Sequence, residues 1–100
     1  MKLPVPLAFD WDQGNIEKNW ARHRVHYKEA EEVFFNRPLA TFKDIKHLQK
    51  EDRFVALGIT DKKRKLHIVF TIRERKIRVI SARDQSKKER TIFISQAKAF

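Results

Sequence analysis

The chain has 100 residues, no cysteine and a formal net charge of +10. This length suits one domain, and the lack of cysteine excludes disulfides and a cysteine-ligated zinc site. No apolar run approaches the roughly 20 residues that cross a bilayer, so we predict a cytoplasmic protein without a membrane segment.

Positive charge is concentrated in the C-terminal part of the chain. Residues 1–60 hold 10 Lys and Arg against 9 Asp and Glu, whereas residues 61–100 hold 13 against 4. A field clustered in this way attracts polyanions and speeds their encounter. Nucleic acid, an acidic membrane surface or an acidic protein would each fit, and the simplest alternative is a solvated surface that serves solubility.

The N-terminal segment predicts an extended arm followed by a helix. Residues 1–8 contain two prolines, which fix an extended backbone. Asp12 is a good N-cap for a helix that ends near His23. Ile16 and Trp20 lie one turn apart and begin the apolar stripe of this helix.

A second helix is predicted over Tyr27–Phe35, where apolar side chains recur at helical spacing. Pro38 ends it, because proline disfavours helical backbone at the residue before it. Residues 39–43 are a candidate first strand. Residues 44–52 are polar and mixed in charge, and they predict a mobile loop.

Three more strands are predicted over residues 54–60, 66–73 and 77–83. Each alternates at period two and is rich in β-branched residues. The links between them are short, so the strands should pair as antiparallel hairpins. In the last strand, alternation places two apolar residues on each face, Ile77 and Val79 on one and Ile80 and Ala82 on the other.

A third helix follows the strands. Ser86 and Glu89 match a capping box, in which each side chain satisfies the other's backbone N–H. The predicted order is therefore helix, helix, three or four antiparallel strands, helix. This is an α+β two-layer domain over residues 1–100, with helices covering one face of a small sheet.

The sequence lacks the motifs of cofactor and nucleophile chemistry. It has only two glycines, no phosphate-cradling loop and no HExxH or GxSxG motif, so we expect no cofactor. His23 and His26 are three residues apart, a spacing that suits a metal. No third ligand is evident, and we expect no metal site.

His23 is the first candidate for proton transfer. It ends the first helix one turn after Asn19, next to Arg22. An imidazole with an ordinary pKa of about 6.5 exchanges protons at neutral pH. The alternative is that His23 caps the helix C-terminus, where a cation is favoured.

Arg78 and Arg83 are the candidates for holding a phosphate. A guanidinium clamps phosphate through two parallel hydrogen bonds and stabilises the extra charge of its transition state. The alternative is a surface salt bridge with Asp84 or Glu89. We expect the first helix and the last strands to bring His23 and both arginines around one phosphodiester.

Other polar residues near these positions are candidates for contacting a nucleic acid. Lys63 and Arg64 lie in a basic hairpin tip, which is usually only solvated but can steer a nucleic-acid backbone. Glu89 is most simply the partner in the capping box. The candidate nucleic-acid contacts are Asn19, Arg22, Lys63, Arg64, Ser81, Glu89 and Arg90, and the resemblance described next implies that the nucleic acid is RNA.

The order and spacing of many of these residues resemble the BrnT family of toxins across roughly residues 9–90. The family usually has glycine where this chain has Arg24. Glycine allows the left-handed turn that ends a helix, and arginine makes that conformation costlier by roughly 1 kcal/mol. The matching residues are Phe9-Asp10-Trp11-Asp12, Asn19, Arg22-His23, Val25, Tyr27, Glu29-Ala30, Val33-Phe34, Pro38, Ile80-Ser81-Ala82-Arg83 and Glu89-Arg90.

The resemblance implies a function and a partner. BrnT toxins are the ribonuclease halves of type II toxin–antitoxin systems and have a RelE-like fold. Metal-independent endoribonuclease activity that inhibits translation is implied, with a 2′-OH attacking the adjacent phosphate to leave a cyclic phosphate. His23 would transfer the proton, and Arg83 with Arg78 would bind the phosphate.

The implied partner is a BrnA-like antitoxin, a DNA-binding ribbon-helix-helix protein that neutralises the toxin in a hetero-oligomer. Two alternatives from other classes stay open. The first is a non-catalytic RNA- or protein-binding module on the same fold. The second is a structural partner of an acidic protein, with no affinity for RNA.

Overall fold

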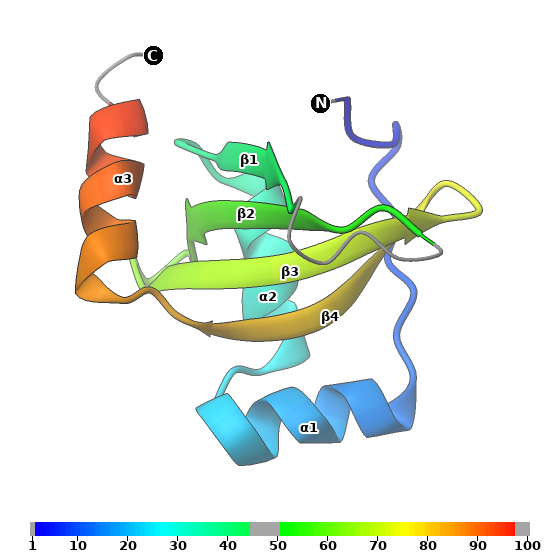
Figure 1. The fold of residues 1–100 in the computed structure, drawn as a ribbon. Coiled ribbons are helices and arrows are strands. Elements are labelled where there is room, and N and C mark those ends of the chain that lie inside the picture. The colour runs from blue at the N-terminus through cyan, green and yellow to red at the C-terminus, as the bar shows by residue number, and fades with distance from the viewer. Residues whose placement is uncertain (1, 45–50, 98–100) are drawn as a thin grey trace.

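The computed structural model describes residues 2–44 and 51–97. Its elements run in the predicted order of two helices, four strands and a helix (Figure 1). The α+β class is therefore confirmed. The predicted loop over 44–52 falls largely on residues 45–50, outside the described residues. The elements are α1 (Gln13–His23), α2 (Tyr27–Phe35), β1 (Ala40–Lys43), β2 (Phe54–Ile59), β3 (Lys65–Arg73), β4 (Lys76–Asp84) and α3 (Lys87–Ala97).

The four strands form one antiparallel sheet in the order β1-β2-β3-β4. Short connections join β2 to β3 and β3 to β4, as their spacing predicts. β4 is thus an edge strand of this sheet. Among the described residues no helix has the length and apolar character needed to span a membrane.

One face of the sheet packs against α2 and forms the main core. The rings of Phe34 on α2 and Phe70 on β3 meet edge to face, 5.1 Å apart. A Cβ added at Gly58 would lie 2.6 Å from Cγ1 of Val33, so glycine lets α2 approach β2 closely. The buried core comprises Val25, Ala30, Val33, Phe34, Ala56, Leu66, Ile68, Phe70, Ile77, Val79 and Ala82.

A β-bulge at Ile80 changes the faces of β4. The pairing steps from Val79 opposite Phe70 to Ser81 opposite Val69, which leaves Ile80 unpaired. The prediction that Ala82 faces away from Val79 is therefore wrong, because the extra residue shifts the alternation by one. Ala82 joins the core, and Ser81 and Arg83 turn to the opposite face.

α1 lies along the free edge of β4 rather than over the sheet (Figure 1). Its amide side chains bond the strand's backbone: Asn15 donates to the Val79 carbonyl, and Oδ1 of Asn19 accepts from the Ala82 N–H at 3.0 Å. Asn19 is accordingly only 2% exposed. The helix thus satisfies backbone groups that an edge strand otherwise leaves open.

The expected apolar stripe of α1 is wrong at Trp20. This side chain is 48% exposed, and the Arg24 guanidinium lies 5.3 Å from the centre of its ring. Amides take the inward positions of α1, because the surface they cover is a polar strand edge. Arg24 itself adopts the left-handed conformation, with φ 54° and ψ 38°, so the turn that glycine usually makes here forms with arginine.

The second face of the sheet, called the open face below, carries Val55, His67, Val69, Ser81 and Arg83. α3 covers one end of it, so the prediction that the helices cover a single face of the sheet is wrong. There Phe93 of α3 is buried against side chains of β1 and β2, namely Ala40, Leu57 and Ile59. The capping box that starts α3 is confirmed, with Ser86 N–H donating to Glu89 Oε1 at 2.8 Å and Glu89 N–H to Ser86 Oγ at 3.2 Å.

Candidate functional site

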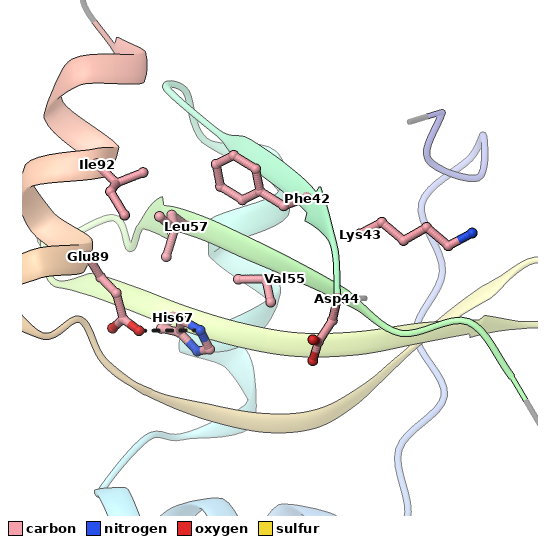
Figure 2. Close-up of a pocket in the computed structure, with 8 residues that line it drawn as sticks. All are labelled: Phe42, Lys43, Asp44, Val55, Leu57, His67, Glu89 and Ile92. Atoms are coloured by element: carbon pink, nitrogen blue, oxygen red, sulfur yellow. Dashed lines mark ion pairs between the residues drawn. The ribbon is translucent and has the colours of Figure 1, made fainter. Parts of the chain in front are cut away.

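Three side chains meet on the open face beside α3. They are Arg83, His67 and Glu89, together called the Arg83 cluster. The register places His67 of β3 directly opposite Arg83 of β4. Nη1 and Nη2 of Arg83 each donate to one carboxylate oxygen of Glu89 at 2.8 Å. Nε2 of His67 lies 3.5 Å from Glu89 Oε2 (Figure 2). Two adjacent strands and the first turn of α3 therefore converge on one carboxylate.

Glu89 is held in its charged form. The hydrogen bonds from Arg83, and after them the one from the Ser86 N–H, lower its pKa to about 2 in spite of partial burial. The same carboxylate raises the pKa of Arg83. Glu89 is thus a fixed anion at neutral pH that orients both neighbours, and it has no proton to donate.

His67 is held neutral. Burial lowers its pKa below the ordinary value, the nearby charge of Arg83 lowers it further, and Glu89 acts in the opposite direction. Its side chain is 14% exposed. We assign the ring proton of the neutral form to Nδ1, which leaves the lone pair on Nε2, the nitrogen on the side of Glu89, able to take up a proton. Nδ1 is buried and has no hydrogen-bond partner among the described residues.

Arg83 keeps donors available. Three of its N–H groups are engaged, two with Glu89 and one with the Asp84 carbonyl. The edge formed by Nε–H and the second Nη2–H carries no hydrogen bond within residues 2–44 and 51–97, and the side chain is 36% exposed. This edge has the geometry that binds two oxygens of one phosphate.

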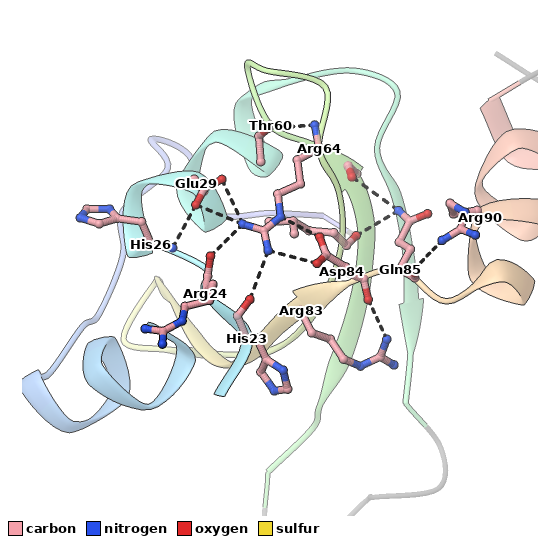
Figure 3. A network of polar contacts seen from close by, with 12 residues as sticks. His23, Arg24, His26, Glu29, Thr60, Arg64, Arg83, Asp84, Gln85 and Arg90 are labelled. Carbon is pink, nitrogen blue, oxygen red and sulfur yellow. Dashed lines mark hydrogen bonds and ion pairs between the residues drawn. The ribbon is translucent and has the colours of Figure 1, made fainter. Parts of the chain in front are cut away.

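Arg64 is the opposite case, because all five of its N–H groups are engaged (Figure 3). Nε and Nη2 bond Asp84 at 2.7 and 3.1 Å, and Nη1 reaches Glu29 at 3.3 Å. The remaining donors bond the carbonyls of Arg24 and His23 at 2.8 and 3.2 Å. Arg64 therefore joins the β2–β3 hairpin to the end of α1 and has no donor left for RNA.

His23 lies at this same junction. Its carbonyl accepts a hydrogen bond from Arg64, and its side chain is close enough to Asp84, the last residue of β4, to influence that carboxylate. The pKa of Asp84 is lowered mainly by the hydrogen bond from Arg64, with a smaller contribution from the charge of His23. In Figure 3 the His23 ring points down from the Arg64 network, and the Arg83 side chain runs to the right of it.

Arg78 does not join Arg83. It pairs with Thr71 at the other end of β4, and its guanidinium bonds Asp12 at 2.5 Å and lies 3.6 Å from Asp10. Five residues of strand separate the two arginines by roughly 16 Å. The expected single cluster of His23, Arg78 and Arg83 is therefore wrong: the bulge at Ile80 gives both arginines a common face, but the rise per residue separates them along the strand.

A family model described as the ribonuclease toxin BrnT of type II toxin–antitoxin systems matches residues 11–89. The chain belongs to this family. The resemblance found in the sequence is thereby confirmed, and with it the function of a ribonuclease toxin that acts on RNA and has an antitoxin as partner. A comparison with curated proteins finds no match.

The remaining predicted RNA contacts of this BrnT toxin divide by exposure. Arg22 and Lys63 are exposed, and Arg90 is exposed while donating to the Gln85 carbonyl at 2.9 Å. Ser81 lies on the open face. Asn19 is buried, and its amide is bonded to the edge of β4, so its side chain is not available to contact RNA.

His26 has a structural position in the toxin. Its Nδ1 accepts from the Lys28 N–H, and Glu29 completes the capping box that starts α2. Within the described part of the chain, no group of three or more His, Asp or Glu side chains gathers to hold a metal ion.

Sequence reasoning missed His67. It stands between Leu66 and Ile68, at an outward position of an amphipathic strand, where a histidine is ordinarily a surface residue. The missing information was the register. Once β3 is paired with β4, His67 lies opposite Arg83, and the bulge at Ile80 decides that pairing.

Proposed function

We propose that this BrnT toxin is a metal-independent endoribonuclease whose active site is the Arg83 cluster. One observation carries the proposal: a guanidinium with a free two-donor edge lies opposite a neutral, largely buried imidazole, and one carboxylate contacts both. Anion-binding and proton-accepting groups are thus adjacent on a chain whose C-terminal part is strongly basic.

In the proposed reaction, the free edge of Arg83 binds the two non-bridging oxygens of the scissile phosphate. The ribose 2′-OH attacks the phosphorus while His67 accepts its proton, and Arg83 stabilises the added negative charge. The bond to the 5′-oxygen then breaks, and that oxygen takes up a proton from an imidazolium. The products are a 2′,3′-cyclic phosphate and a free 5′-OH.

His23 is the second imidazole at this end of β4 and is the alternative donor to the 5′-oxygen. Glu89 has a positioning role, since it holds Arg83 and His67 without exchanging a proton. The RNA on either side of the scissile phosphate would be contacted by Arg22, Lys63, Ser81 and Arg90. Arg78, at the far end of the same face, would bind RNA at a distance from the cut.

The proposed setting is the cytoplasm, where cleavage of RNA would inhibit translation. We further propose a BrnA-like ribbon-helix-helix antitoxin as the partner that neutralises the toxin in a hetero-oligomer. The family membership supports this pairing, and the exposed basic surface supplies a face that an inhibitor can cover.

The test is cleavage of a structured RNA by the purified toxin in EDTA, with mass analysis of the product ends. We expect cyclic phosphate ends and a loss of at least about 100-fold in rate for His67→Ala, the usual size of a general-base contribution. Arg75→Ala is the matched control for loss of charge, because Arg75 is exposed in the β3–β4 turn.

Two results would count against the proposal. Full activity of His67→Ala together with loss of activity in His23→Ala would show that His23, at the end of α1, is the general base. RNA that is bound but stays intact at high toxin concentration would instead support the alternative of a binding module without turnover.

A further inference from the structure

A hollow of about 340 Å³ adjoins the Arg83 cluster on the open face (Figure 2). His67 and Glu89 line it on the side of the cluster. The rest of its lining is mainly apolar and comes from β1, β2 and α3. The complete lining is Phe42, Lys43, Asp44, Val55, Leu57, His67, Glu89 and Ile92.

The hollow exposes large apolar side chains. Phe42 on β1 is 38% exposed and Ile92 on α3 is 40% exposed, while Leu57 beneath them is 2% exposed. The fold thus leaves an aromatic ring and an aliphatic side chain facing an open space over a buried floor. Exposed apolar groups gathered around a concave site are typical of a ligand-binding surface.

We infer that this hollow receives the base of the nucleotide whose phosphate is bound by Arg83. The inference rests on the proposed function for its substrate, RNA. A nucleotide is a flat, largely apolar ring joined through a sugar to an anion. The hollow and the free edge of Arg83 offer the matching pair, an apolar space with an exposed phenyl ring beside a guanidinium.

Phe42 is the specific contact. Proteins that bind single-stranded RNA stack unpaired bases on aromatic side chains. In this hollow the apolar side chains of Val55 and Leu57 form the floor, and Phe42 supplies the aromatic face. Lys43 and Asp44 are part of the same lining and would lie near the polar edge of a bound base.

Binding of small ligands tests the inference without catalysis. The probes are the four nucleoside 3′-monophosphates and inorganic phosphate, titrated into the whole toxin by calorimetry. Stacking of one base predicts that at least one nucleotide binds about five- to 150-fold more tightly than phosphate. Phe42→Ala should abolish that difference, Phe42→Trp should keep it, and Arg83→Ala should weaken nucleotides and phosphate alike.

Phe35→Ala is the matched control, because Phe35 is a phenylalanine on α2 that is even more exposed than Phe42, at 62% against 38%, and lies away from the open face. It should leave the ratio unchanged. Equal affinity of the wild-type toxin for nucleotides and phosphate, or a ratio that survives Phe42→Ala, would overturn the inference. So would a Phe42→Ala toxin that binds nucleotides normally but binds its antitoxin less tightly, since the hollow would then hold a protein side chain.

The inference and the proposed function fail separately. A toxin that binds bases through Phe42 but leaves RNA intact would contradict only the proposed chemistry. A toxin that cuts RNA through His67 and Arg83, yet binds nucleotides no better than phosphate, would contradict only the assignment of the hollow.

Discussion

Replacing Arg64 by alanine should destabilise the toxin strongly. Two of its five donors join the β2–β3 hairpin to the end of α1, the other three bond Asp84 and Glu29, and the side chain is only 26% exposed. The two bonds to carbonyls are worth about 1 kcal/mol each. The ion pair with Asp84, which is 64% exposed, adds at most about 1 kcal/mol.

The expected loss is therefore about 3 kcal/mol in the free energy of unfolding. For a domain of this size that corresponds to a fall in Tm of roughly 12–24 °C. Thermal unfolding followed by circular dichroism measures it. Arg64→Lys should recover only part of the loss, because one ammonium reaches fewer of these acceptors.

Lys62→Ala is the control, since it removes the same charge from an exposed position of the same hairpin. Its Tm should stay close to that of the wild type. An Arg64→Ala toxin no less stable than Lys62→Ala would refute the conclusion that the Arg64 network holds α1 in place.

Three further predictions follow from individual contacts. Asn19→Ala should cost about 1–3 kcal/mol in urea unfolding, because the buried Ala82 N–H loses its acceptor; an unchanged midpoint would contradict this. The pKa of Glu89, lowered to about 2, means that its stabilisation is complete above about pH 4.5 and is lost as the pH falls toward 2. Solvent screening limits this contribution to about 1–2 kcal/mol, and Glu89→Gln should flatten the wild-type decline over that range. The lowered pKa of His67 keeps the imidazole neutral below pH 6.5, so the acid limb of kcat/KM should lie below 6.5; a limb above 6.5 would contradict a base at His67.

Local sequence signals were sufficient for the elements of the fold. The capping box of Ser86 and Glu89, the N-cap at Asp12 and the alternating strands depend on neighbours in the chain, and the structure confirms them. The prediction that Trp20 lies on a buried apolar stripe was wrong, because hydrophobic periodicity assumes that the helix packs against an apolar surface. α1 instead covers the polar edge of β4, and it does so with Asn15 and Asn19.

The candidate site depended on information that periodicity does not contain. The bulge at Ile80 decides which side of the sheet Arg83 faces and which residue of β3 lies opposite. The sequence offered the Arg83–Glu89 ion pair as an alternative, and the structure contains it, but the grouping of Arg83 with Arg78 around one phosphodiester is wrong. His67 became visible only with the register, and Arg78 was excluded only by its distance along the strand.

The central claim is that RNA is cut at the α3 end of the open face, and the two arginines of β4 test it most directly. We predict that Arg83→Ala lowers kcat/KM by at least about 100-fold, as loss of a transition-state contact does. Arg78→Ala should lower it only a few-fold, because it removes one charge far from the cut. Equal losses in both variants, or a larger loss in Arg78→Ala, would contradict the placement of the site.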